Sequence, residues 1–291
     1  MGKVFNALKK AGEEATVSRE TAPVSAEQQP VAKVKKEKIP RQPSRKRKKT
    51  IPVMLERGDW DERLVLATAV TSSVSESFRT LRTRILHPES GKPLRNVLVT
   101  SATPGEGKSF ICANLGISCA QGLDHQGLLV DCDLRKPSLA KIFGLSNERG
   151  LVNYLRDNED LSSLITEVGV DQLRILPAGV PPVNPAELLG SGMMEQLIQE
   201  LGSRYDDRVV FFDSPPLQAA SETAILAKYV DGVVLVVRWG AGRREHIKSL
   251  VELIGRDKII AVVFNAYKSN VLDDKVFGAY EYQHNYYYGK K

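Results

Sequence analysis

The sequence predicts a doubly wound α/β fold, a mostly parallel sheet with helices on both faces. Short apolar, β-branched runs recur along the chain, and helical patterns alternate with them. Right-handed crossovers are expected to join the parallel strands. The predicted strands cover residues 97–99, 127–133, 173–176, 209–213, 232–237 and 259–264. The predicted helices cover residues 74–86, 110–115, 151–155, 161–165, 184–189, 193–201 and 244–254.

The most informative stretch is residues 95–109, where a predicted strand leads through a glycine-containing loop into a helix. Strand, loop and helix together indicate a phosphate-binding loop, which makes the expected fold class an α/β P-loop NTPase. Lys108 is expected to reach the β- and γ-phosphates, and the Ser109 hydroxyl to ligate Mg²⁺. Ala102 stands where the usual pattern has its first glycine. Alanine tolerates most backbone conformations except positive φ, so the loop is expected to accept this change.

Three aspartates follow predicted strands, namely Asp131, Asp133 and Asp213. In parallel sheets, ligands bind outside the carboxyl ends of the strands, so folding should gather these residues beside the P-loop. Ser109 with Asp131 or Asp213, directly or through water, would hold Mg²⁺, and a second carboxylate could accept a proton from an attacking hydroxyl. A single aspartate after a strand is often only a helix cap. The coincidence of all three with a P-loop predicts a nucleotide site.

Charge is unevenly distributed along the 291 residues. Residues 1–50 hold fourteen Lys and Arg against five Asp and Glu, whereas the remainder holds 27 against 30. No apolar run approaches the roughly 18 residues of a membrane span, and the first twenty residues lack a secretory apolar region. Cys112, Cys119 and Cys132 have no CxxC spacing, which is typical of reduced thiols. These features predict a cytoplasmic protein whose basic pI belongs to a tail.

Composition divides the chain into three parts. Residues 1–58 are expected to form a disordered basic tail, with a possible short amphipathic helix at 3–11 that touches a membrane or a partner. A frayed terminus explains the same pattern. The basic cluster at 45–49 could bind anionic lipid or nucleic acid, or it could be a solvated linker. The folded domain is expected over 59–278, and a flexible tyrosine-rich tail over 279–291.

Several motifs together resemble those of the bacterial tyrosine kinases, a P-loop family unrelated to eukaryotic kinases. Residues 102–109 are similar to the family's Walker A motif, where alanine is usual at the first position. Residues 129–137 are similar to its Walker A′ motif and residues 211–216 to its Walker B motif. The resemblance implies a kinase domain over 59–278 that uses ATP and Mg²⁺. It implies nucleotide contacts from Thr103, Pro104, Gly105, Glu106, Gly107, Lys108, Ser109, Phe110 and Asn265.

The resemblance also assigns catalytic roles. Lys108 and Ser109 would grip the phosphates and the metal, and Asp131 would activate a tyrosine hydroxyl. Asp133 and Asp213 would position Mg²⁺ or its waters. Residues 76–82 are similar to the family's E-x-x-R-x-x-R element, through which subunits form a ring. That element implies an oligomer contact from Glu76, Arg79 and Arg82, although an exposed charged helix is also an ordinary solvated surface.

The C-terminal tail carries five of the chain's nine tyrosines, Tyr280, Tyr282, Tyr286, Tyr287 and Tyr288. Aromatic stacking or aggregation is the alternative explanation of such a cluster. In the family, this cluster is the substrate and is phosphorylated in trans by a neighbouring subunit. Several phosphates of nearly −2 charge each would repel carboxylates and one another, which would weaken the ring.

The resemblance further implies a role in exopolysaccharide biosynthesis, with regulation of chain length or export. It implies a separate membrane chain-length determinant as activator, because the sequence offers no membrane span of its own, and a cognate tyrosine phosphatase. The expected location is the cytoplasm, peripheral at the inner face of the cell membrane. The basic tail would dock on the activator or on anionic lipid. Nucleic acid is not an expected partner.

Three other functions share parts of this pattern. A partition or septum-site ATPase has the same fold, but that group usually has lysine at the second P-loop position, where this chain has Thr103, and it lacks a tyrosine tail. An iron–sulfur carrier ATPase would need a CxxC pair, which is missing from the sequence. A nucleotide-bound scaffold whose basic tail binds DNA or a membrane remains the non-enzymatic alternative, and salt-sensitive duplex binding would favour its DNA-binding form.

Overall fold

The structure, a computed structural model, describes residues 59–64, 73–88, 91, 93–122, 126–204, 208–219 and 221–266. The predicted basic tail at 1–58 with its helix at 3–11 and the tyrosine tail at 279–291 lie outside these residues. Their boundaries therefore stay predictions. Within the described ranges, no helix combines the length and the apolar character needed to cross a bilayer.

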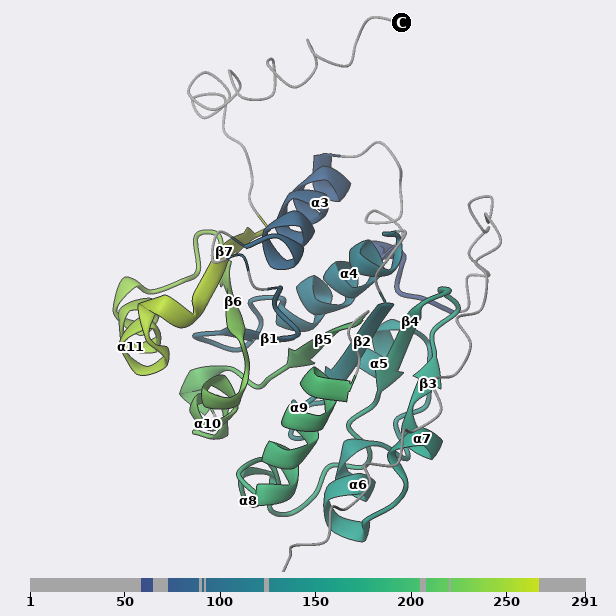
Figure 1. The fold of residues 1–291 in the computed structure, drawn as a ribbon. Helices are drawn as coiled ribbons and strands as arrows, with labels where there is room; N and C mark the ends of the chain where they lie inside the picture. Colours follow the sequence, from purple (N-terminus) through teal and green to yellow (C-terminus); the bar gives the residue numbers. More distant parts are fainter. Residues whose placement is uncertain are drawn as a thin grey trace, which may run out of the picture. The chain divides into compact units, whose positions relative to one another are not determined.

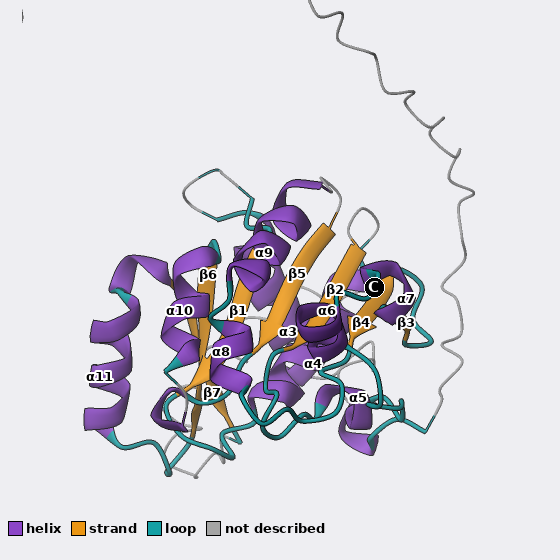
Figure 2. Ribbon diagram, turned by 90° about the horizontal axis from the view of Figure 1, so that it is seen from below, coloured by secondary structure: helices purple, strands orange, loops and turns teal. Residues whose placement is uncertain are grey.

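A seven-stranded sheet forms the centre of the described fold, in the order β3-β4-β2-β5-β1-β6-β7 (Figure 2). Every neighbouring pair is parallel except β3 and β4. The predicted parallel sheet is thus confirmed, and the two-residue antiparallel edge strand β3 is an addition. The strands are β1 (Asn96–Ser101), β2 (Gln126–Asp131), β3 (Thr166–Glu167), β4 (Leu173–Leu176), β5 (Arg208–Asp213), β6 (Gly232–Arg238) and β7 (Ile259–Asn265).

Helices cover both faces of this sheet (Figure 1). In that view α3 and α4 lie above the sheet, whereas α8, α9 and α10 lie below it. The helices are α3 (Ser73–Leu86), α4 (Lys108–Ala120), α5 (Leu139–Ile142), α6 (Leu151–Asp157), α7 (Leu161–Leu164), α8 (Pro185–Leu189), α9 (Gly192–Arg204), α10 (Glu222–Tyr229) and α11 (Arg244–Ile254). Two 3₁₀ turns, η1 (Leu217–Ala219) and η2 (Arg256–Lys258), complete the list.

Two large apolar layers, one on each side of the sheet, form most of the core, and a smaller cluster includes Leu235 of β6 and Leu250 of α11. Val97 and Val99 of β1 pack into the layer that contains α3 and α4, whereas Leu98 packs into the layer that contains α9 and α10. All three side chains have no exposed surface. Both faces of a central parallel strand are covered by helices, so its sequence is a continuous apolar run instead of an alternating one. This double burial fixes the carboxyl edge of the sheet, where the P-loop begins.

Candidate active site

The P-loop joins β1 to α4 through a backbone that requires glycine. Gly105 and Gly107 have φ of 79° and 92°, in the left-handed region that other residues avoid. A Cβ atom on Gly107 would lie 2.1 Å from the Nδ2 atom of Asn265. Ala102 is not among the described non-glycine residues with positive φ. Alanine is therefore accommodated at the first position of the motif, as expected.

Side chains outside the cavity brace the loop. Asn265 donates from Nδ2 to the carbonyl oxygen of Glu106 at 2.8 Å, and Arg238 donates from Nη1 to the carbonyl oxygen of Gly105 at 3.2 Å. The Glu106 side chain is buried, and its Oε2 atom accepts the Thr103 N–H at 3.1 Å. Thr103, Glu106 and Asn265 thus hold the loop without lining the cavity in front of it. Their predicted nucleotide contacts remain predictions.

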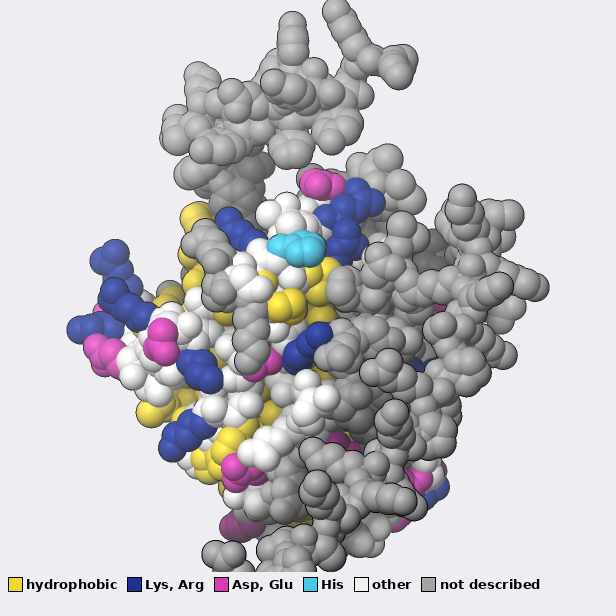
Figure 3. Space-filling view, viewed as in Figure 1, with side chains coloured by type: hydrophobic (Ala, Val, Ile, Leu, Met, Phe, Trp, Pro, Cys, Tyr) yellow, Lys and Arg dark blue, Asp and Glu magenta, His cyan; other side chains and the backbone are white. Residues whose placement is uncertain are grey.

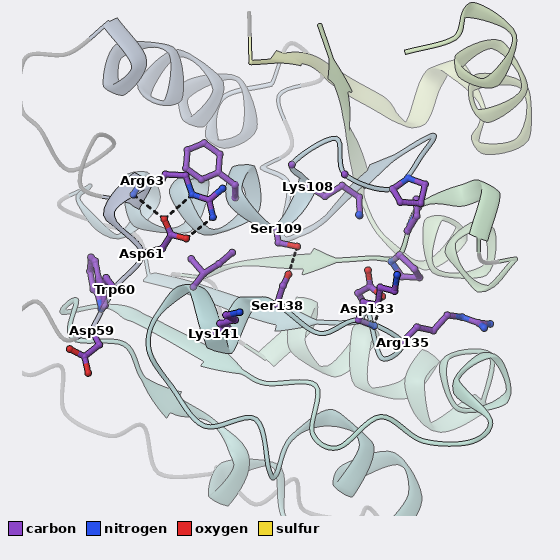
Figure 4. A pocket seen from close by; sticks show the side chains of 18 residues that line it. Asp59, Trp60, Asp61, Arg63, Lys108, Ser109, Asp133, Arg135, Ser138 and Lys141 are labelled. Atoms are coloured by element: carbon purple, nitrogen blue, oxygen red, sulfur yellow. Dashed lines mark hydrogen bonds and ion pairs between the residues drawn. The ribbon is translucent and has the colours of Figure 1, made fainter. Parts of the chain in front are cut away.

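A cavity of about 680 Å³ opens in front of the P-loop (Figure 4). Its walls come from the P-loop, the segment between β2 and α5, the segment at 59–63, and the turn after β5. Among the predicted site residues, those that line it are Pro104, Gly105, Gly107, Lys108, Ser109, Phe110 and Asp133. Asp131 and Asp213 lie behind the lining, with no exposed surface. The strand ends therefore bring Lys108, Ser109 and the three aspartates close together.

Asp131 is built into the floor of the site by backbone donors. Its Oδ1 atom accepts the Asp133 N–H at 3.1 Å, and its Oδ2 atom accepts the N–H groups of Ser138 and Leu139, each at 3.0 Å. Asp131 is also the register partner of Asp213 across β2 and β5. Burial raises the pKa of the Asp131 carboxyl well above its usual range, and the neighbouring Asp213 charge adds to the rise. The two carboxyl groups therefore do not both ionise freely.

Asp213 has unused hydrogen-bonding capacity. Both carboxylate oxygens are buried, and neither accepts a hydrogen bond from the described residues. Burial raises the pKa of Asp213 from 3.8 to about 7, although Lys108 and then the nearby Ser109 hydroxyl oppose the rise. The Ser109 hydroxyl thus lies near enough to favour the ionised form of Asp213, although it does not form a hydrogen bond to either Asp213 carboxylate oxygen. A buried acceptor that lacks a donor is suited to a cation or to the water around one.

Ser109 is the remaining oxygen donor for a metal. Its Oγ atom accepts a hydrogen bond from the Ser138 hydroxyl at 2.7 Å. No cluster of three or more His, Cys, Asp or Glu side chains forms a self-sufficient metal site within the described ranges. Mg²⁺ typically combines one or two protein oxygens with phosphate oxygens and waters. The residues present fit that ligand set, with Ser109 and Asp213 as the protein donors.

The thermal stability of the fold should depend on whether the buried Asp213 carboxyl is ionised. Because its folded pKa of about 7 exceeds the unfolded value of 3.8, this carboxyl stabilises the nucleotide-free fold below about pH 4 and loses that contribution as pH rises to 7. Asp213→Asn imitates the protonated form. We expect its Tm to gain on the parent by a few degrees between pH 5 and 8, since 1 kcal/mol shifts Tm by roughly 2–4 °C in domains of such size. A pH-independent Tm difference in thermal melts would contradict this assignment.

The predicted oligomer residues lie on α3, and they do not all face outward. Arg79 is in an ion pair with Glu76 at 2.9 Å. Arg82 instead donates from Nη1 to the carbonyl oxygen of Ser118 at 2.6 Å, in the last turn of α4. Lys and Arg side chains gather over α3 and over α11 (Figure 3). Arg82 therefore joins α3 to the P-loop helix, and a subunit contact by Glu76, Arg79 and Arg82 stays a prediction.

Several site residues were not predicted from the sequence. Trp60 and Arg63 form a wall opposite the P-loop, and no local motif marks them. Arg135 lines the cavity and is held at 3.1 Å by Glu222, a carboxylate with 1% exposed surface on α10. Arg135 lies inside the Walker A′-like stretch, so the motif could have identified it as a site residue. Glu222 follows the end of β5 by nine residues, and nothing in its sequence position reveals the contact with Arg135.

Comparison with known proteins decides the family. A scan against protein-family models gave no match. The tyrosine-protein kinase YwqD of Bacillus subtilis is 36% identical over 215 residues, which cover 73% of this chain and 90% of that protein. This chain belongs to the bacterial tyrosine-kinase family. The family resemblance carried by the Walker-like motifs is thereby confirmed.

Solved structures agree with membership of the bacterial tyrosine-kinase family. The kinase domain of the Escherichia coli tyrosine kinase ETK superposes with a TM-score of 0.64 at 29% identity, over 74% of this chain and 85% of that one. The cell division ATPase MinD of Pyrococcus furiosus has a TM-score of 0.50 at 19% identity, over 61% of this chain and 74% of that one. The latter likeness shows the shared P-loop fold alone.

Proposed function

We propose that this chain is an ATP-dependent protein-tyrosine kinase whose acceptors are the tyrosines of its own C-terminal tail. The observation that carries the proposal is one cavity that combines a P-loop lysine, a lining carboxylate and two buried carboxylates with an aromatic wall. Its volume of about 680 Å³ lies within the usual range for ligand pockets. The family's relatives supply the reaction class, and the five tail tyrosines supply the acceptor.

The residues divide the work as follows. Lys108 and the loop N–H groups bind the phosphates, and Ser109 with Asp213 binds Mg²⁺, which neutralises charge on the phosphate oxygens when bound. Asp131 takes the proton of the acceptor phenol at a carboxylate oxygen, as the phenolic oxygen forms its bond to the γ-phosphorus and ADP leaves. A phenol has a pKa near 10, so a carboxylate whose pKa burial has raised is a better match than a free one.

The proposal extends to regulation. Transfer occurs in trans, between copies that associate through α3, and the phosphorylated tails repel one another and loosen the assembly. A separate membrane protein of an exopolysaccharide system activates the kinase and holds it at the inner face of the cell membrane, and a cognate tyrosine phosphatase reverses the modification. The basic segment at 1–58 docks on that activator or on anionic lipid.

Replacement of the five tail tyrosines by phenylalanine tests the acceptor assignment. The full chain is co-expressed with the membrane protein of its polysaccharide system, purified and incubated with Mg²⁺ and ATP. Peptide mapping should place phosphotyrosine at 280–288 in the parent and remove it in the variant, while ATP binding is unchanged. Phosphotyrosine that persists elsewhere in the variant would show that the acceptor tyrosines lie outside 280–288. A parent without phosphotyrosine would overturn the kinase proposal.

A further inference from the structure

The cavity has a second wall that the nucleotide machinery does not use. The segment at 59–64 lies across from the P-loop, and the Asp61 N–H fixes it to α5 by donating to the carbonyl oxygen of Ile142 at 3.0 Å. Trp60 packs edge-on against Phe143, with ring centroids 5.5 Å apart. Trp60 and Ile142 both line the cavity. This wall offers an apolar surface of the kind that receives a phenol ring.

Lys141 is the basic side chain of this wall that forms no ion pair within the part of the chain that the structure describes. Figure 4 draws it between Trp60 and Ser138, among the lining residues. Arg63 is not available in the same way, because both carboxylate oxygens of Asp61 accept bonds from its guanidinium. Lys141 forms no ion pair with any residue of the described ranges. It lies close enough to Asp61 to add to the lowering of the Asp61 pKa that Arg63 causes. Because Arg63 already pairs with both Asp61 oxygens, the Lys141 ammonium can still meet an anion that enters the cavity.

The backbone places Lys141 at a fixed distance from the catalytic carboxylate. The N–H groups of Ser138 and Leu139 bind Asp131, so α5 is anchored directly on the proposed base. Lys141 follows Ser138 by three residues, about 5 Å along a helix. An extended peptide advances about 3.3 Å per residue. In the proposed reaction, where the tyrosine hydroxyl is directed toward Asp131, this spacing puts Lys141 within reach of a side chain one or two positions away from that tyrosine.

We propose that Lys141, beside Trp60, is a specificity-determining residue that binds an anionic group next to the acceptor tyrosine. This inference rests on the proposed kinase function. The anion is a carboxylate or a phosphate, and the tail offers both sources, since Glu281 lies between Tyr280 and Tyr282. When Tyr282 is already phosphorylated, the same site favours Tyr280. One modification of the tail thus promotes the next.

Three biotinylated peptides test the preference on the full chain, purified with its membrane activator and supplied with Mg²⁺ and ATP. Each covers residues 278–285 and keeps Tyr280 as the acceptor. The first carries Tyr282→Phe and the second adds Glu281→Gln to it. The third has phosphotyrosine at position 282. We expect the parent to prefer the first peptide over the second by about two- to five-fold in kcat/KM, the size of an exposed ion pair, and the third over the first.

Lys141→Gln should remove both preferences by raising KM for the first and third peptides, with kcat and the KM for ATP unchanged. Lys141→Arg should restore them. Lys228→Gln serves as the matched control, because Lys228 is an exposed lysine of α10 that does not line the cavity. The inference is overturned if the parent uses the three peptides equally, or if Lys141→Gln keeps the parent's ranking. A parent that phosphorylates its own tail but none of the peptides also overturns the inference, whereas a parent that phosphorylates neither overturns the proposed kinase function itself.

Discussion

Lys108→Met is expected to reduce tyrosine phosphorylation by about 10²–10³-fold or more, the cost of removing one preorganised group that stabilises developing charge. Lys108 is the first residue of α4 and has 7% exposed surface. It is the main opposing influence on the raised pKa of Asp133 and of Asp213. Its removal therefore takes away both the phosphate grip and the cation that keeps these carboxyls ionisable.

Quantitative phosphotyrosine detection on the full chain measures this loss. Methionine nearly preserves the side-chain length, so the far-UV circular dichroism and Tm should stay close to those of the parent. Lys228→Met is the control for a lost lysine charge, and it should retain parental activity. A Lys108→Met chain that retains activity within a factor of three would show that the P-loop does not bind the transferred phosphate.

Asp131→Asn is expected to lower kcat by about 10²–10⁴-fold, the range for loss of a general base. In addition, the asparagine side chain has only one acceptor oxygen, whereas both oxygens of Asp131 accept backbone hydrogen bonds. Either the Asp133 N–H or the pair from Ser138 and Leu139 would face an NH₂ group. An unsatisfied buried donor costs about 1–3 kcal/mol. Lower stability and lower kcat should therefore appear together.

Asp133→Asn, measured in the same kinetic assay, tests whether Asp131 or Asp133 is the general base. Asp133 lines the cavity, and its Oδ1 atom accepts the backbone N–H of Lys136 at 3.1 Å. If Asp131 is the base, Asp133→Asn should cost clearly less in kcat. A larger loss from Asp133→Asn than from Asp131→Asn would assign the proton transfer to Asp133.

The sequence was sufficient where local pattern determines structure. Val97–Val99 and Val209–Asp213 are buried on both faces, so their strands stand out as apolar runs, and Gly105 and Gly107 supply the positive-φ positions of the loop. The carboxyl ends of β2 and β5 bring Asp131, Asp133 and Asp213 to one edge of the sheet.

The rest depended on contacts between distant segments. The four residues of α5 are too few to show a helical period, and its position is set by Asp131. Trp60 is held at the cavity wall by packing against Phe143, which lies more than eighty residues later in the chain. Arg82 donates to a carbonyl oxygen in the last turn of α4, a contact that its spacing on α3 does not reveal. No period or spacing in a single sequence encodes such pairings.

A mixing experiment tests the central claim most directly. Lys108→Met supplies an inactive site with an intact tail, and the chain with phenylalanine at the five tail positions supplies an intact site without acceptors. Incubated together with the activator, Mg²⁺ and ATP, the pair should yield phosphotyrosine at 280–288 of the Lys108→Met chain, whereas neither yields it alone. If the parent is phosphorylated but the mixture is not, transfer occurs within one chain. If neither the mixture nor the parent is phosphorylated, the chain is not a kinase of its own tail.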